Sequence, residues 1–184
     1  MYLLYLIGML QKKEMSKTVI DKYPLSLIEV GFIKCIFPKA KFILSIRHPC
    51  DVVISCYSSA FKINDAMINF LDWNDTINFY KETFTLFEFY TNQFKIDYHI
   101  IKYENIVQNF KFEITKLLSY LKLNYEKNLE NFFITAQNRS KISTPSYTQV
   151  INPLYHSSIN RWKNYKNKKN SHQELSKWIK KFNY

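Results

Sequence analysis

The chain has 184 residues, of which 47% are hydrophobic and 17% aromatic. This length predicts one domain, residues 1–184, and the composition excludes an intrinsically disordered chain, which would contain fewer apolar residues. The formal net charge of +11 indicates an anionic ligand or partner, and the presence of only two glycines, Gly8 and Gly31, excludes a glycine-rich phosphate-binding loop.

The first predicted elements are two helices and a strand. The apolar residues 1–10 predict a buried helix, because they lack the basic segment and cleavage site of a signal peptide. Residues 21–37 predict a helix with Pro24 in its first turn and an end before Pro38. The apolar run at residues 41–46 predicts a strand buried on both faces of a parallel sheet.

After this strand the helical pattern returns. Pro49 and Asp51 open a short helix. Aromatic residues then recur every three or four positions over residues 66–94, which predicts one long amphipathic helix or two in tandem. Residues 98–103 predict a second buried strand, and a further helix follows. This alternation is typical of a doubly wound α/β sheet.

The rest of the chain predicts a loop and a closing helix. Residues 136–160 are polar and contain two prolines, as long functional loops do. Residues 167–184 predict a terminal basic helix. Three cysteines, at spacings that match no zinc or disulfide pattern, favour a reduced, cytoplasmic setting.

Arg47 is the first candidate binding residue, because ligands of open α/β sheets lie at the carboxyl ends of the strands. The helix that follows favours an anion at its N-terminus, and Ser55 stands one turn beyond Asp51 on that helix. Arg47 and Ser55 could therefore form a phosphate clamp. The simpler alternative is a surface ion pair between Arg47 and Asp51, with Ser55 in solvent.

Four segments of the sequence form an ordered set: Asp21-Lys-Tyr-Pro24, Arg47-His-Pro-Cys-Asp51-Val-Val-Ile-Ser55, Lys102-Tyr-Glu-Asn-Ile106, and a C-terminal block with Arg139, Ser143-Thr-Pro-Ser146 and Arg161-Trp-Lys163. Together they resemble sulfotransferases that use 3′-phosphoadenosine 5′-phosphosulfate (PAPS). The resemblance is closest to the branch of the tyrosylprotein sulfotransferases and the bacterial sulfotransferases often fused to TPR repeats. It extends over about residues 20–166.

The resemblance implies a fold, a reaction and a set of site residues. The fold is a P-loop-kinase-like, doubly wound parallel sheet with flanking helices. The reaction is transfer of a sulfonate from PAPS, the co-substrate, to a hydroxyl acceptor, with no metal. Lys22 would be catalytic, by stabilising charge on the oxygens between sulfur and the leaving phosphate. The implied cofactor-binding residues are Arg47, Ser55, Tyr103, Ser146 and Arg161.

One part of the family pattern is missing. Relatives begin with a strand and a loop of the kind Pro-Arg-Ser-Gly-Thr-Thr, which wraps the 5′-phosphosulfate, and this chain contains no such loop. Sulfuryl transfer, like phosphoryl transfer, depends on positioning and on electrostatic stabilisation of the departing group. We therefore expect an N-terminally truncated domain that lacks the first strand and phosphosulfate loop, and whose independent activity is impaired.

Other functions remain open. The chain could be a non-catalytic binder of a 3′-phosphorylated adenine nucleotide, or the partner of a separately encoded N-terminal piece or TPR region. Nucleic-acid binding is disfavoured, because the lysines are spread along the chain and no RRM or helix-turn-helix signature is present. No membrane span is expected. The acceptor would be a small molecule, a sugar or a protein tyrosine.

Overall fold

Two parallel strands lie at the centre of the structure, a computed structural model that describes residues 19–137, 151–165 and 170–184. Strand β1 (Phe42–Ile46) pairs with β2 (Tyr98–Lys102), with Phe42 opposite Tyr98 and Ile46 opposite Lys102. Parallel strands need a long crossover connection. Here it contains α3 (Pro49–Ser58), η2 (Met67–Phe70) and α4 (Trp73–Gln93), so most of the predicted 66–94 segment is one long α-helix, preceded by the short 3-10 turn η2.

The first described helices cover one side of the sheet. The chain forms η1 (Pro24–Glu29) and then α2 (Val30–Ile36), with Pro24 in the first turn and the end before Pro38, as predicted. Gly31 allows α2 to lie close to α4, because a Cβ atom there would stand 2.7 Å from Cδ1 of Tyr90. A side chain at this position would push the two helices apart.

A hydrophobic core fills the space between the sheet, α2, α4 and the last helices. Leu44 and Ile46 of β1 face this core, where Phe84 and Phe87 of α4 pack against them. The predicted terminal helix is two short helices, α9 (Asn170–Glu174) and α10 (Ser176–Lys181). The core residues that these helices and their flanks contribute are Leu175, Trp178, Ile179 and Phe182.

Helices also cover the opposite face of the sheet, but only in part. Helix α6 (Phe110–Leu121) lies beside β2, where the ring of Tyr120 stacks on His99 with ring centroids 5.3 Å apart. Ile43 of β1 is 44% exposed on this side. The prediction of a first strand buried on both faces is therefore wrong, because the α6 contacts are made with β2.

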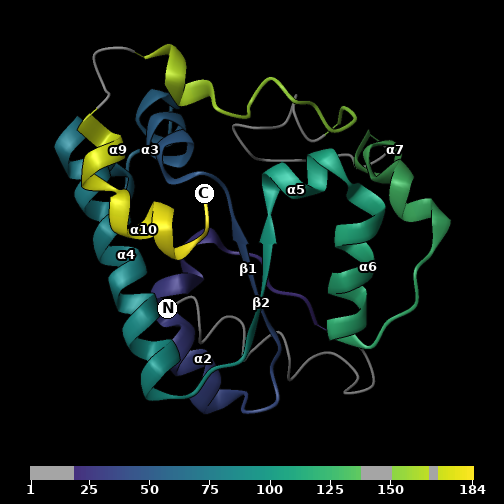
Figure 1. Ribbon diagram of the computed structural model, residues 1–184. Helices are drawn as coiled ribbons and strands as arrows, with labels where there is room; N and C mark the ends of the chain where they lie inside the picture. The colour runs from purple at the N-terminus through teal and green to yellow at the C-terminus, as the bar shows by residue number, and fades with distance from the viewer. Residues whose placement is uncertain (1–18, 138–150, 166–169) are drawn as a thin grey trace.

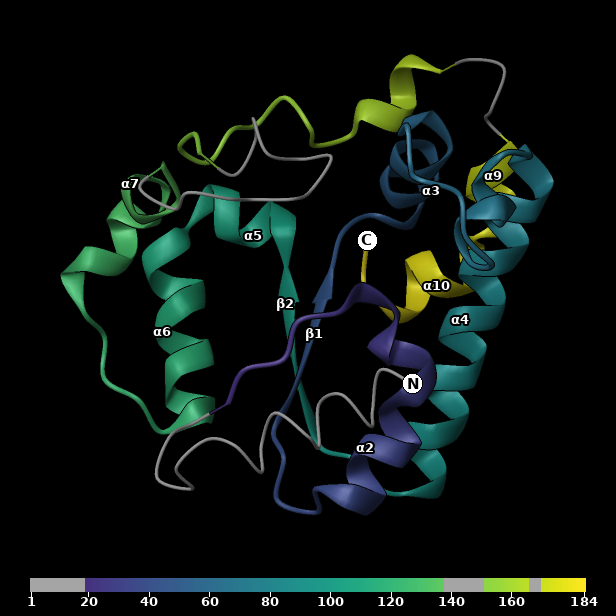
Figure 2. The same ribbon diagram turned by 180° about the vertical axis from the view of Figure 1, so that it is seen from behind.

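The remaining elements lie around the carboxyl ends of the strands or beside α6 (Figure 1). They are α5 (Tyr103–Gln108), η3 (Lys127–Asn131), α7 (Phe132–Gln137) and η4 (Arg161–Asn164). Figure 2 shows residues 151–164 crossing above the carboxyl ends of both strands. The fold is thus α/β, with a parallel sheet and flanking helices, as predicted.

Some predictions fall on residues outside the described ranges. These are the helix over residues 1–10, most of the first half of the predicted 136–160 loop, and Ser146. Within the described ranges, no helix has the length and apolar character that crossing a membrane requires.

Candidate functional site

Arg47 and Tyr103 lie next to each other at the carboxyl ends of the two strands. Arg47 follows β1 directly and Tyr103 follows β2, and the register pairs the residues just before them. The guanidinium carbon of Arg47 lies 5.6 Å from the centre of the Tyr103 ring, within the range of a cation–π contact. The sequence predicted both as nucleotide-binding residues, and the structure brings them together.

The start of α3 is held by local capping. His48 is the N-cap residue, and its Nδ1 accepts a hydrogen bond from the Cys50 backbone amide at 3.2 Å. Pro49 suits the first helical position, because its fixed φ matches the helix and no amide hydrogen is lost there. Asp51 in the first turn is favoured by the helix dipole. The turn after β1 therefore places Asp51 one helical turn beyond Arg47.

The Arg47 guanidinium has two oxygen partners, and one of its donors is buried without a partner among the described residues. Its Nη2 lies 3.6 Å from Oδ2 of Asp51 and also donates to the carbonyl oxygen of Ser158. Its Nε is buried and has no hydrogen-bond partner among the described residues. The ion pair with Asp51, the simpler of the two sequence-based alternatives, is thus present. It is not a surface pair, however, because Asp51 is only 1% exposed.

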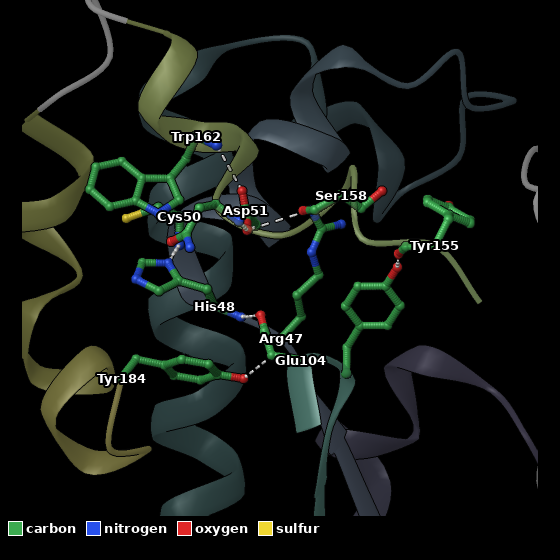
Figure 3. Close-up of polar contacts among 11 residues, drawn as sticks. Arg47, His48, Cys50, Asp51, Glu104, Tyr155, Ser158, Trp162 and Tyr184 are labelled. Atoms are coloured by element: carbon green, nitrogen blue, oxygen red, sulfur yellow. Dashed lines mark hydrogen bonds and ion pairs between the residues drawn. The ribbon is translucent and has the colours of Figure 1, made fainter. Parts of the chain in front are cut away.

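Residues 155–162, which we call the strap, are attached to the strand ends through main-chain atoms (Figure 3). The Tyr103 hydroxyl donates to the carbonyl of Tyr155 at 2.9 Å. The Asp51 carboxylate accepts from the backbone amides of Asn160 at 2.9 Å and Trp162 at 2.8 Å. Together with the Arg47–Ser158 bond, four hydrogen bonds join three side chains to the strap backbone: Arg47 and Tyr103 donate, and Asp51 accepts twice.

Glu104 joins the site to the end of the described chain. One of its oxygens accepts from the His48 backbone amide at 2.9 Å, and the other accepts from the Tyr184 hydroxyl at 2.8 Å. The His48 ring stacks on Trp162, with centroids 5.2 Å apart, and meets Tyr184 edge-on at the same distance. We call Arg47, Asp51, Tyr103 and Glu104 the strand-end cluster.

Burial sets the protonation of the groups around this cluster. Burial lowers the pKa of His48, which keeps the imidazole neutral and able to accept at Nδ1. Burial raises the pKa values of Tyr103 and Tyr184, so both hydroxyls remain donors at neutral pH. Burial also raises the pKa of the Cys56 thiol to about 11, although the charge of Arg47 acts in the opposite direction.

The structure also describes three further predicted site residues, Ser55, Arg161 and Lys22. Ser55 lies on α3, half-buried, one turn beyond Asp51. Arg161 belongs to η4, but its exposed side chain donates to the Tyr165 hydroxyl at 3.1 Å rather than to the cluster. Lys22 is exposed in the segment before η1, and no contact links it to the cluster within the described residues.

Sequence reasoning missed the roles of Glu104 and Tyr184. For the strap, it predicted a functional loop over residues 136–160 but not the backbone contacts that hold it. Glu104 could have been suspected, since a carboxylate two residues after a strand is close to the sheet and, once buried, needs hydrogen-bond partners. Tyr184 carries no such signal, because it lies 80 residues from Glu104 in sequence. The strap contributes backbone atoms, and these leave no trace in residue type. Within the described residues no group of three or more His, Cys, Asp or Glu could hold a metal.

Comparisons with known proteins identify a family, a relative and a shared fold. A family model described as "Sulfotransferase family" matches residues 3–127. An uncharacterised protein of Aquifex aeolicus (strain VF5) is 26% identical over 151 residues, which are 80% of this chain but only 19% of that protein. A sulfotransferase domain from the curacin biosynthetic pathway has a TM-score of 0.64 at 18% identity, covering 94% of this chain and 67% of that one. This structural likeness shows a shared fold.

Proposed function

Because the chain belongs to the sulfotransferase family, we propose that Arg47 of its strand-end cluster binds the 3′-phosphate of PAPS, in a protein that transfers sulfonate to a hydroxyl acceptor. The observation that carries the proposal is the buried Nε of Arg47, a donor without a partner among the described residues. A buried donor of this kind costs free energy unless an acceptor meets it. A phosphate oxygen is a suitable acceptor, because guanidinium groups bind phosphate bidentately.

Phosphate binding would rearrange the contacts of Arg47. Nη2 donates to the Ser158 carbonyl, a neutral acceptor, in the structure. A phosphate oxygen is a stronger, charged acceptor and would take the place of this carbonyl. Asp51 would keep its ion pair with Arg47 and hold the guanidinium plane in place. We further propose that Ser55 donates to the same phosphate and that Tyr103 packs against the nucleotide.

Three residues enter the proposal through the resemblance alone. Ser146 and Arg161 would reach the 3′-phosphate, and Lys22 would stabilise charge at the transferred sulfonate. For Arg161 this requires release from the Tyr165 hydroxyl. All three cysteines are free thiols, which supports the proposed cytoplasmic setting.

The transfer step itself is proposed to be weak in this polypeptide. The sequence contains only two glycines, Gly8 and Gly31, and no glycine-rich motif of the kind that wraps a 5′-phosphosulfate. Each charge-assisted hydrogen bond of such a loop contributes about 1.5 to 3 kcal/mol. The lack of such a loop in the sequence also supports the second candidate function, a nucleotide binder without independent activity. A separately encoded partner could supply the loop.

Calorimetric titration with adenosine 3′,5′-bisphosphate tests nucleotide binding. We expect binding by the wild-type chain and at least tenfold weaker binding by Arg47→Ala, because about 1.4 kcal/mol corresponds to a factor of ten and one charge-assisted bond exceeds this. Adenosine 5′-monophosphate, which lacks the 3′-phosphate, should bind wild type as weakly as the bisphosphate binds the variant.

The control variant is Lys39→Ala, which removes an exposed positive charge at the opposite end of β1. It should bind like wild type. Equal losses in the two variants would mean that general charge attraction accounts for binding, and the proposed site would then be wrong.

A turnover assay separates the two candidate functions. The purified chain is incubated with PAPS and a panel of phenols, sugars and tyrosine peptides, and sulfonated products are measured by mass spectrometry. Nucleotide binding with little turnover supports the binder, whereas turnover well above background refutes the expected impairment. Loss of that turnover in Lys22→Ala would assign the catalytic role to Lys22.

A further inference from the structure

The residue after Tyr103 links three parts of the chain. Glu104 is 9% exposed and accepts one hydrogen bond at each carboxylate oxygen. The donors are the backbone amide of His48 and the hydroxyl of Tyr184. Because His48 directly follows Arg47, the first bond fixes the peptide that carries the Arg47 side chain.

Tyr184 is itself held by three further parts of the structure. Lys102, the last residue of β2, donates to the carbonyl of Asn183 at 3.0 Å, and its ammonium group lies 4.5 Å from the centre of the Tyr184 ring. The backbone amide of Tyr184 donates to the carbonyl of Ile179 at 3.0 Å. The ring also meets His48 edge-on. Tyr184 is therefore a fixed donor rather than a freely moving side chain.

The protonation states suit this role. Burial and the hydrogen bond to Glu104 raise the pKa of Tyr184 well above its ordinary value, so the phenol keeps its proton at physiological pH. A buried carboxylate is stable only when donors satisfy its oxygens. If one donor is removed, Glu104 must move or admit water, and its bond to the His48 amide changes with it.

We propose that Tyr184 and Glu104 are positioning residues for Arg47. Through the His48 amide they hold the guanidinium in the orientation that meets the 3′-phosphate of the nucleotide. This inference rests on the proposed function, but it gives Glu104 and Tyr184 roles that neither the sequence pattern nor the family comparison assigned. It predicts that nucleotide affinity depends on a hydroxyl that does not touch the ligand.

The test uses Tyr184→Phe, which removes the hydroxyl and keeps the ring and its packing. Two quantities are measured on the full chain. One is the dissociation constant for adenosine 3′,5′-bisphosphate, expected to rise about three- to tenfold. The other is the NMR signal of the Arg47 Nε–H group, identified by its absence in Arg47→Lys and expected to shift without any ligand present.

The chain offers a matched control in Tyr125→Phe. The Tyr125 hydroxyl donates to Oε1 of Glu130 at 2.9 Å, an equivalent tyrosine–glutamate bond at the exposed surface. This variant should leave both the affinity and the Arg47 signal unchanged. Glu104→Gln tests the same prediction by a second variant. Its effect on affinity should not add to that of Tyr184→Phe, because both variants disturb the hydrogen bonds from Tyr184 through Glu104 to the His48 amide, which we call the bridge.

The outcomes separate the inference from the proposed function. If wild type binds the bisphosphate and Tyr184→Phe binds equally well, the inference is overturned and the proposed function stands. If wild type does not bind, the proposed function fails, and the Arg47 signal alone decides whether the bridge positions the guanidinium. An unchanged Arg47 signal in both Tyr184→Phe and Glu104→Gln overturns the inference in either case. A loss of thermal stability without these changes indicates a purely structural bridge and also overturns it.

Discussion

The hydrophobic core beside α4 and the strand-end cluster are held together in different ways. In the core, side chains pack on side chains: the ring of Phe84 lies 5.5 Å from Trp178 and 5.2 Å from Phe182, centroid to centroid. In the cluster, side chains bind the main chain of other segments. Asp51, the most buried of them, accepts two backbone amides from the strap.

This difference determines what a substitution does in each region. Core contacts are non-directional and roughly proportional to the apolar area removed from water, so their loss lowers the stability of the whole domain. The cluster contacts depend on distance and angle. Their loss changes where the strap and Arg47 lie, and only secondarily the global stability. Substitutions in the two regions should therefore separate stability from nucleotide affinity.

The largest expected effect is that of Phe84→Ala in the core. Phe84 is 7% exposed, and truncation of a buried phenylalanine to alanine costs about 3 to 5 kcal/mol of unfolding free energy. Urea denaturation measures this loss. Molecules that remain folded should bind adenosine 3′,5′-bisphosphate as wild type does. The control is Phe89→Ala on the same helix, where the side chain is 58% exposed and little stability should be lost.

A smaller effect is expected for Asp51→Asn in the cluster. The asparagine side chain keeps one acceptor oxygen for one strap amide, but its NH₂ group faces the other. Two donors then meet without an acceptor, which lowers the free energy of unfolding by about 1 to 3 kcal/mol. We expect faster cleavage of the strap by chymotrypsin and weaker nucleotide binding. Cleavage and binding that match wild type would show that the strap is held by other contacts.

The matched control for this variant is Asp72→Asn. Asp72 also accepts from two backbone amides, those of Asn74 and Asp75, but as the exposed N-cap of α4. Asparagine is as good an N-cap as aspartate, so the stability of this variant should be close to that of wild type. The pair of variants isolates the effect of burial and of the strap from that of the amino-acid change.

The contrast also explains what the sequence could predict. Apolar runs identified both strands, and hydrophobic periodicity identified the helix within residues 66–94, because burial by side chains leaves a pattern in the sequence. Arg47 was identified because it follows a strand and belongs to a recognisable segment, whereas Tyr103 was identified through the resemblance of its segment alone. Their contact then follows from the parallel register.

The remaining contacts could not be predicted from residue types. The partners of Asp51, Arg47 and Tyr103 on the strap are backbone atoms, which every residue possesses. The exposure of Ile43 also left no signal in the strand pattern, because it depends on where α6 packs. Local sequence thus predicted the elements, whereas contacts between distant segments had to be seen in three dimensions.

The smallest expected effect is the pH dependence that His48 confers on stability. Burial lowers the pKa of His48; the carboxylates of Asp51 and Glu104 oppose this shift, and the charges of His172 and Lys163 add to it. The unfolded chain therefore takes up a proton near the ordinary value of 6.5 before the folded chain does. Stability from this group is complete above pH 6.5, falls as the pH is lowered toward the folded-state pKa, and is constant below it.

The variant His48→Asn isolates this contribution. Asparagine can cap α3 in place of the imidazole but does not titrate. Urea unfolding of both proteins between pH 7.5 and pH 5 gives two stability profiles, and their difference cancels the other three histidines. Wild type should lose stability relative to the variant as the pH falls. A flat difference would mean that the pKa of His48 is the same in the folded and unfolded states, and the expected lowering by burial would then be wrong.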